Sequence, residues 1–259
     1  MARAVFFSTL SLQSAMTSTF STHATGKKSI AIMQPYFLPY LGYFQLIEAV
    51  DKFVVFDDVN YIRGGWINRN RMLVHGSPHL FTIPLQGASQ NRRICDIALL
   101  GDAIWRDKLL RTFNQAYGQA PHHRKVMDVL ERIVHFPSLQ LDRFLLNSLQ
   151  QLMRYMGIQT ELHATSRTYA NDALAGEHRI IDICVREGAS DYVNPSGGTN
   201  LYHHDNFARE GIALHFLQSR ASHYPQGKHA HVAGLSIIDV LMHNSPGAIT
   251  QLLAERDFA

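Results

Sequence analysis

The sequence predicts an α/β protein with a Rossmann-like, mainly parallel sheet and helices on both faces, plus a β-hairpin and a helical insertion. Two observations in the 259 residues predict this class. Short apolar runs of β-forming residues alternate with longer segments whose apolar residues have helical spacing. Proline, glycine and asparagine mark the boundaries between these segments. Strand–helix alternation of this kind makes neighbouring strands parallel, because each helix carries the chain back across the sheet.

The chain opens with a predicted strand–helix–strand unit. Ser29–Met33 is short, apolar and β-forming, and Gln34-Pro35 ends it. Leu41–Val50 then has helical spacing of its large apolar residues. Phe53–Phe56 follows as a second buried strand, and the acids Asp57-Asp58 end it.

A hairpin and three helices come next. Trp66–Val74 alternates side chains between two faces, and a turn sequence separates it from His79–Leu85, which predicts a hairpin. Three segments with helical apolar spacing follow and are expected to form an insertion at about residues 103–156: Ala103–Tyr117, His123–Phe136 and Ser138–Met156.

The alternation of strands and helices then resumes. The predicted elements, in order, are a strand Ile158–Leu162, a helix Gly176–Gly188, a strand Asp191–Val193, a helix around Thr199–Arg209 and a strand Ile212–Leu217. We expect residues 29–259 to form a single α/β domain. Met1–Lys28 is rich in serine and threonine and resembles a targeting peptide superficially, but a disordered leader or an upstream start codon is the favoured interpretation.

Charge and composition argue against several classes of protein. The net charge is +3 and the basic residues are scattered, so no nucleic-acid partner is expected. No apolar run reaches the roughly twenty residues of a membrane span. Cys95 and Cys184 lie far apart without a CxxC spacing, which fits two buried thiols in a reducing cytoplasm rather than a catalytic thiol.

Polar and aromatic residues follow the first two predicted strands. Gln34, Tyr36 and Tyr40 come after the first strand, and Asp57 and Asp58 come after the second. The carboxyl ends of parallel strands meet at one edge of a sheet, where α/β proteins bind ligands. We expect one acid to face a cleft as a general base or orienting group, and the other to brace the loop, because adjacent residues point to opposite sides. The alternative is that these residues only cap the elements or fill the core.

If the segment from Trp66 to Arg71 is extended, its side chains alternate between two faces. Trp66, Asn68 and Asn70 fall on one face, and Arg69 and Arg71 fall on the other. Asparagine amides bind hydroxyls or base edges, and a guanidinium binds phosphate or carboxylate. An edge strand that exposes arginine for solubility has the same pattern.

Asn194-Pro195-Ser196-Gly197-Gly198-Thr199 lies between a predicted strand and a predicted helix. Ser196, Gly197 and Gly198 are candidates for a cradle that holds phosphate or carboxylate with backbone amides. A Gly-Gly turn with Thr199 as a helix cap has the same sequence. The segment is neither a P-loop nor a GxGxxG motif.

The C-terminal third is rich in histidine. His223, Tyr224, Gln226 and His229 are expected to line a loop near the strand ends, with one histidine exchanging a proton. No metal site is expected, because no HExxH or other recognisable ligand spacing occurs. Asp239 lies among apolar residues of a helix capped by Ser236, so it is either paired and functional or simply exposed.

Several motifs together resemble a known family. MQPYFLPYLGYFQLI, FVVFDDVNYI, GWINRNR, YPQ and LSIIDVLMHN are similar to the signature segments of the WbqC-like protein family, from about Met33 to Asn244. The resemblance implies a bacterial protein associated with surface-polysaccharide (O-antigen) gene sets or small-molecule biosynthesis. It also favours a ligand-binding role for the segment from Trp66 to Arg71.

A second resemblance concerns layout only. A strand, a P-x-x-P-x-x-G-Y helix start and a strand ending in acids are similar to the opening of HIGH-type nucleotidylyltransferases. Those proteins have an H-x-G-H motif whose two histidines contact nucleotide phosphates. Here Tyr40 and Tyr43 stand near the corresponding places, and Gly42 is retained. A tyrosine hydroxyl donates to phosphate but is uncharged at neutral pH.

The expected function is therefore that of a cytoplasmic transferase acting on a nucleotide-linked or amino-sugar intermediate of surface-polysaccharide or related small-molecule biosynthesis. Acyl or aminoacyl transfer is favoured. The alternatives are a nucleotidyl- or adenylate-forming transferase of the HIGH type, and a non-catalytic ligand-binding protein. The expected partner is a small molecule such as a nucleotide sugar, an amino sugar or an acyl donor. The sequence indicates no particular cofactor.

Overall fold

A computed structural model describes residues 26–220, 223–228 and 230–259. Its centre is a six-stranded sheet in the order β10-β9-β8-β1-β2-β7. The strands are β1 (Ser29–Met33), β2 (Lys52–Val55), β7 (Glu161–His163), β8 (Asp191–Pro195), β9 (Ala213–Ser219) and β10 (Arg256–Phe258). The first five are parallel, and only β10 runs antiparallel to its neighbour β9. The predicted mainly parallel sheet is confirmed.

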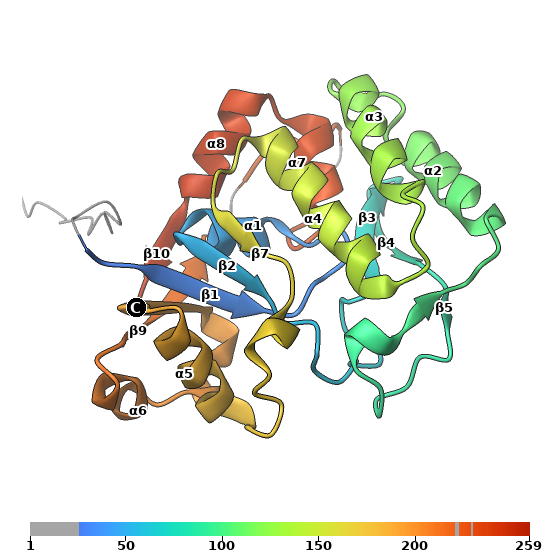
Figure 1. The fold of residues 1–259 in the computed structure, drawn as a ribbon. Helices are drawn as coiled ribbons and strands as arrows, with labels where there is room; N and C mark the ends of the chain where they lie inside the picture. Colours follow the sequence, from blue (N-terminus) through green and yellow to red (C-terminus); the bar gives the residue numbers. More distant parts are fainter. Residues whose placement is uncertain (1–25, 221–222, 229) are drawn as a thin grey trace, which may run out of the picture.

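Helices cover both faces of this sheet (Figure 1). The helices are α1 (Leu41–Glu48), α2 (Ile104–Tyr117), α3 (His123–Val134), α4 (Leu141–Met156), α5 (Gly176–Arg186), α6 (His204–Arg209), α7 (Ile237–His243) and α8 (Pro246–Ala254). Apolar residues alternate between the faces along the strands. Ala31 and Phe53 pack into one core, with α1, α4, α7 and α8, whereas Ile30 and Val54 pack into the other, with α5 and α6.

The hairpin and the helical segment lie to one side of the sheet (Figure 1). The hairpin is β3 (Arg69–Val74) with β4 (Ser77–Thr82), paired antiparallel. A second small pair is β5 (Leu85–Gln86) with β6 (Ala98–Leu99). Helices α2, α3 and α4 pack against one another, and their side chains share one continuous core with the sheet.

One predicted helix is wrong. The segment predicted as a helix at Thr199–Arg209 contains a 3₁₀ helix, η3 (Ser196–Leu201), and the separate α6. Tyr202 and His203 have extended backbone between them. The 3₁₀ helix begins at Ser196, so Thr199 lies inside it and does not cap α6. The other 3₁₀ helices are η1 (Ile94–Asp96) and η2 (Ser166–Tyr169).

Candidate functional site

The strand order places a crevice at the carboxyl edge of the sheet. The chain builds outward from β1 to β2 and β7, and then crosses back to add β8 and β9 on the other side of β1. Helices therefore leave β1 and β8 on opposite faces, and the loops after these two strands separate. In open α/β sheets, ligands bind at such a switch point.

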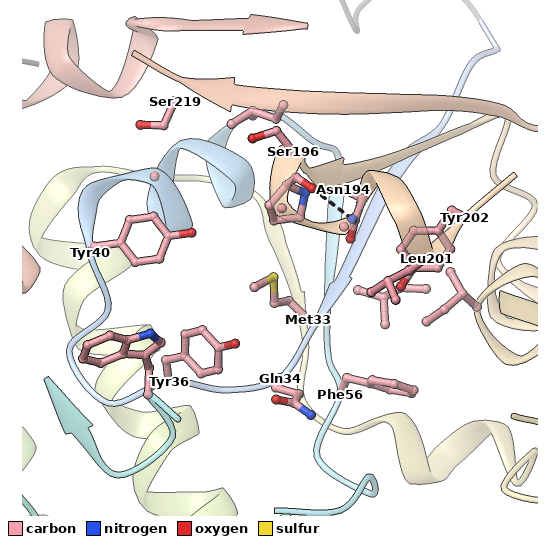
Figure 2. A pocket seen from close by; sticks show the side chains of 18 of the residues that line it. Met33, Gln34, Tyr36, Tyr40, Phe56, Asn194, Ser196, Leu201, Tyr202 and Ser219 are labelled. Carbon is pink, nitrogen blue, oxygen red and sulfur yellow. Dashed lines mark hydrogen bonds between the residues drawn. The ribbon is translucent and has the colours of Figure 1, made fainter. Parts of the chain in front are cut away.

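A cavity of about 520 Å³ lies at this place. It is open to solvent and has the size of a small-molecule site. Its lining comes from two parts of the chain that are far apart in the sequence, between Ile32 and Trp66 and between Ile180 and Ser219 (Figure 2). The lining residues are Ile32, Met33, Gln34, Tyr36, Tyr40, Gly42, Phe56, Ile62, Trp66, Ile180, Asn194, Pro195, Ser196, Gly197, Gly198, Leu201, Tyr202, Leu217 and Ser219.

The lining is neutral. Among the described residues around the cavity there is no carboxylate, ammonium, guanidinium or imidazole group. Burial raises the pKa of Tyr36, Tyr40 and Tyr202 above the ordinary value, so their hydroxyls stay protonated. The polar groups that remain are amides and hydroxyls, which bind uncharged oxygen and nitrogen atoms of a ligand.

Seven of the predicted binding residues line this cavity: Gln34, Tyr36, Tyr40, Trp66, Ser196, Gly197 and Gly198. Tyr43 lies beneath it instead. Its side chain is 1% exposed and its hydroxyl donates to the carbonyl oxygen of Gln34 at 2.8 Å, so it fixes the backbone that carries Gln34.

Asn70 braces the loop between β1 and α1, whereas Asn68 bonds to other segments. Asn68 accepts a hydrogen bond from Tyr61 and donates to the carbonyl of Ile83. Asn70 donates to the carbonyl of Leu38, a residue with positive φ. Both asparagines are buried, and their amides face the protein rather than the cavity.

Two guanidinium groups flank Trp66 at the cavity. Trp66 is 36% exposed, and Arg69 and Arg71 lie 6.0 and 5.5 Å from its ring centroid. Arg69 donates to the carbonyls of Gly65 and Gly64, which keeps its side chain beside the loop. The cations are therefore next to the neutral cavity but outside its lining.

Asp57 and Asp58 point toward the loop 165–167 and helix α5. Asp57 accepts from the Thr165 hydroxyl at 2.8 Å and from the Ser166 amide at 3.1 Å. Burial raises its pKa, although the hydrogen bond from Thr165 opposes this rise. Asp58 accepts from Ser166 and forms an ion pair with Arg179 at 2.5 Å, and both ion-pair side chains are buried. Neither acid lines the cavity of about 520 Å³, which we call the strand-end cavity.

Asp58 does border a neighbouring cavity of about 490 Å³. That space also contacts Arg93, Glu177 and Arg179, and it shares a wall with the strand-end cavity. The shared wall consists of Phe56, Ile180, Leu201 and Tyr202. A charged compartment and a neutral compartment therefore adjoin along this edge of the sheet.

The glycines of η3 allow a close backbone approach. A Cβ atom on Gly198 would collide with the side-chain amide of Asn194, whereas a Cβ on Gly197 would meet nothing within 4 Å. Asn194 donates to the carbonyl of Pro195 at 3.1 Å, which orients its amide at the cavity (Figure 2). Gly198 is needed for this arrangement, and Gly197 is not.

The C-terminal loop is tied to Asp239. This carboxylate is fully buried and accepts from Tyr117 at 3.0 Å, Tyr224 at 2.8 Å and Gln226 at 2.8 Å. Ser236 caps α7, as predicted. Tyr224, Gln226 and Asp239 do not line the strand-end cavity, nor does His223. His229 lies outside the described residues.

Sequence reasoning did not select Phe56, Tyr202 or Ser219 for the site. Phe56 and Ser219 stand at the carboxyl ends of β2 and β9, so the rule that selected Gln34 also applies to them. Tyr202 had no such signal, because its position depends on the break between η3 and α6. In the described part of the chain, no three histidine, cysteine or acidic side chains gather in a group suited to a metal ion.

Fold and cavity together define an open, doubly wound α/β protein with an uncharged cavity at the switch point of its sheet. Residues 34–251 match the model of the WbqC-like protein family. The chain belongs to this family, because the match covers most of its length.

One curated relative is "Uncharacterized protein Rv1507c" from Mycobacterium tuberculosis (strain ATCC 25618 / H37Rv). It is 31% identical over 171 residues, which are 64% of this chain and 72% of the relative. No solved structure matches the chain significantly. Across the described residues, the helices are too short or too polar to cross a membrane.

Proposed function

We propose that this protein is a cytoplasmic transferase that binds a nucleotide-linked sugar or an amino sugar in the strand-end cavity. The observation that carries the proposal is the uncharged lining of aromatic rings, amides and hydroxyls. A sugar ring has apolar faces that stack on aromatic side chains and hydroxyls that bond to amides. Gln34, Asn194 and Ser196 supply such polar groups, and Trp66 supplies a ring.

The surroundings of the cavity suit the charged part of a nucleotide sugar. Arg69 and Arg71 lie beside Trp66, where a diphosphate would emerge from the neutral cavity. Guanidinium groups pair with phosphate through two parallel hydrogen bonds. The family resemblance supplies the context of surface-polysaccharide or related small-molecule biosynthesis, and acyl or aminoacyl transfer to a sugar amine is the favoured reaction.

In this proposal Asp57 and Asp58 act through the loop 165–167 and helix α5. Their hydrogen bonds to Thr165 and Ser166 and the ion pair with Arg179 hold these segments against the end of β2. The wall shared by the two cavities includes Ile180, the residue after Arg179. The acids therefore shape the binding site.

Calorimetric titration tests the ligand class. UDP-N-acetylglucosamine and UDP-glucosamine are titrated into the full chain, with UMP and free glucosamine as the two halves of the ligand. We expect a nucleotide sugar to bind more tightly than either half, and to raise the melting temperature by mass action. If no nucleotide sugar binds, the proposed function is wrong. Binding without transfer of an acyl group from a thioester or an ATP-activated donor would indicate a ligand-binding protein.

Nucleotidyl transfer is the second candidate, and the strand order favours it. The order β7-β2-β1-β8-β9 is that of mononucleotide-binding sheets, and Tyr40 and Gly42 border the cavity at the start of α1. The lining lacks a cation, so the phosphates of ATP would also have to reach Arg69 and Arg71 beside Trp66. Release of pyrophosphate from ATP in the presence of a sugar phosphate would select this reaction over acyl transfer.

A further inference from the structure

A smaller cavity of about 170 Å³ adjoins the strand-end cavity. The two share Tyr40, Gly42 and Ser219, so these residues form the border between them. Gly42 allows close packing at this border, because a Cβ atom there would lie 3.1 Å from the Cβ of Ser219 and would press against the Tyr40 ring. The remaining walls come from Leu41, Arg220, Tyr224, His231, Ala233, Gly234, Leu235 and Val240. We call this space the side cavity.

The side cavity contains an imidazole group. Among the described residues that line the two adjoining cavities, His231 alone has an imidazole, the side chain that most often serves as a general base in enzymes. The other charged group is Arg220, whose guanidinium forms an ion pair with Asp257 on β10. Within the described part of the chain, a reaction in these cavities that needs a proton acceptor therefore has one candidate side chain.

The ring of His231 is held in one orientation. Its Nδ1 lies 3.3 Å from the carbonyl oxygen of Tyr224, and because a carbonyl only accepts, Nδ1 is assigned the proton. Nε2 is then the basic nitrogen. The ring packs against His223, with centroids 4.2 Å apart, and meets the Tyr224 ring edge-on.

Gln226 and Asp239 fix the backbone beside His231. The Gln226 side chain accepts from the Val232 amide at 2.6 Å and donates to the Val232 carbonyl at 3.0 Å. The same amide nitrogen of Gln226 donates to the buried carboxylate of Asp239 at 2.8 Å. These two are positioning residues, because neither lines the strand-end cavity or the side cavity.

We propose that His231 is the proton acceptor of the transfer reaction, and that the side cavity receives the reacting amine and acyl group. This assignment rests on the proposed function. The amine nitrogen of the sugar bonds to the carbonyl carbon of an acyl thioester, and its proton passes to Nε2. The carbon–sulfur bond breaks with its electron pair on sulfur, and the imidazolium returns the proton to the thiolate.

Histidine labelling tests the placement without requiring turnover. The full chain is treated with diethyl pyrocarbonate, and modification of each histidine is followed by peptide mass spectrometry. His79, which is exposed on β4, is the internal control. We expect His231 to react, and its rate to fall about tenfold at a UDP-glucosamine concentration ten times its Kd, since occupancy then exceeds 90%. The rate at His79 should not change.

The outcomes separate the two proposals. If calorimetry detects no nucleotide sugar binding, the proposed function fails and the reaction assigned to His231 fails with it. If UDP-glucosamine binds but does not protect His231, or if His231 never reacts, the assignment of His231 is overturned while the proposed function stands.

A matched pair of variants then tests the role in transfer. His231→Gln should lower acyl transfer from a thioester to UDP-glucosamine by about 100-fold or more, with the Kd within about threefold of wild type. Added imidazole should restore part of the rate. His79→Gln should transfer at the wild-type rate. Wild-type turnover of His231→Gln would overturn the proposal.

Discussion

The neutral cavity and the acid cluster, formed by Asp57 and Asp58 with their partners, lie at the same edge of the sheet. Polar groups face open space in the cavity, whereas in the acid cluster they bond to other protein groups. Gln34 follows β1, Asn194 and Ser196 lie at the carboxyl end of β8, and all three border an open space. Asp57 and Asp58 follow β2 and face partners within the protein. Position at a strand end therefore places a side chain at this edge of the sheet. Whether the side chain then faces the cavity depends on the protein groups to which it bonds. Removing a residue should lower folding stability in the acid cluster and ligand affinity in the cavity.

The largest effect is expected for Asp58→Asn. This change leaves the Arg179 guanidinium buried without its carboxylate, and loss of one partner of a buried ion pair costs about 4 kcal/mol of unfolding free energy. Asp57→Asn should cost about 1 kcal/mol, because its amide oxygen still accepts from Thr165 and Ser166. Urea denaturation measures both. Equal losses in the two variants would contradict this division within the acid cluster.

Glu187 belongs to a second charged cluster, with Lys28 and Lys52, at the opposite edge of the sheet. This cluster is far from the cavity, so it tests how much a charged cluster contributes to stability alone. Burial raises the pKa of Glu187, but hydrogen bonds from Lys28, Lys52 and Tyr169 outweigh burial and hold the pKa at about 2, below the ordinary 4.5. A lowered folded pKa stabilises the protein above pH 4.5, and this contribution of about 3 kcal/mol disappears as the pH falls toward 2.

Glu187→Gln should therefore lose stability at pH 7 and show a flatter dependence of unfolding free energy on pH between 5 and 2. Denaturant titrations across this range measure the dependence. Glu131→Gln, on the exposed side of α3, is the control and should behave as wild type. An unchanged acid profile for Glu187→Gln would show that other carboxylates govern acid unfolding.

Gly198→Ala should weaken ligand binding without a comparable effect from Gly197→Ala. The new methyl group displaces the Asn194 amide, so a hydrogen bond to the ligand is lost and affinity for UDP-glucosamine falls about tenfold. Gly197 borders the same cavity but has open space around it. Calorimetry on the pair distinguishes a specific close approach from a general sensitivity of η3, which would weaken both variants alike.

Trp66→Ala should have the smallest effect, a loss of about five- to tenfold in affinity, the scale of one stacking contact. Trp66 is 36% exposed, so the loss of unfolding free energy should be smaller than for Asp58→Asn. Trp66→Ala would then change mainly ligand affinity, whereas Asp58→Asn changes mainly the free energy of unfolding. A large drop in stability of Trp66→Ala would place Trp66 in the framework instead of the binding surface.

Local sequence patterns predicted most of the sheet. The short run Ser29–Met33 is β1 as predicted, because its two isoleucines favour a strand and its first four residues are buried. The predicted helix over Thr199–Arg209 was wrong because glycines and asparagine favour a tight 3₁₀ turn, after which Tyr202 takes an extended backbone to reach Tyr192 and Phe207.

The site was harder to predict, because partners distant in sequence decide where side chains point. Asp57 and Asp58 are adjacent residues and should point to opposite sides, yet both bond to Ser166, more than 100 residues later. His231 was not selected from the histidine-rich third, because only the anchoring of Gln226 to Asp239 distinguishes it. The catalytic roles assigned from sequence to Asp57, Asp58, His223 and His229 stay predictions.

The pairing of β1 with β8 has a consequence for the timing of site formation. Ser29 lies opposite Asp191, so the two halves of the cavity meet only when segments about 160 residues apart in the chain come together. Contacts of such long range form slowly, and a growing chain on the ribosome cannot make them until most of the sequence has emerged. A ligand of the strand-end cavity would thus recognise only molecules that have completed the central sheet, and its binding would measure the fully folded fraction in a refolding reaction.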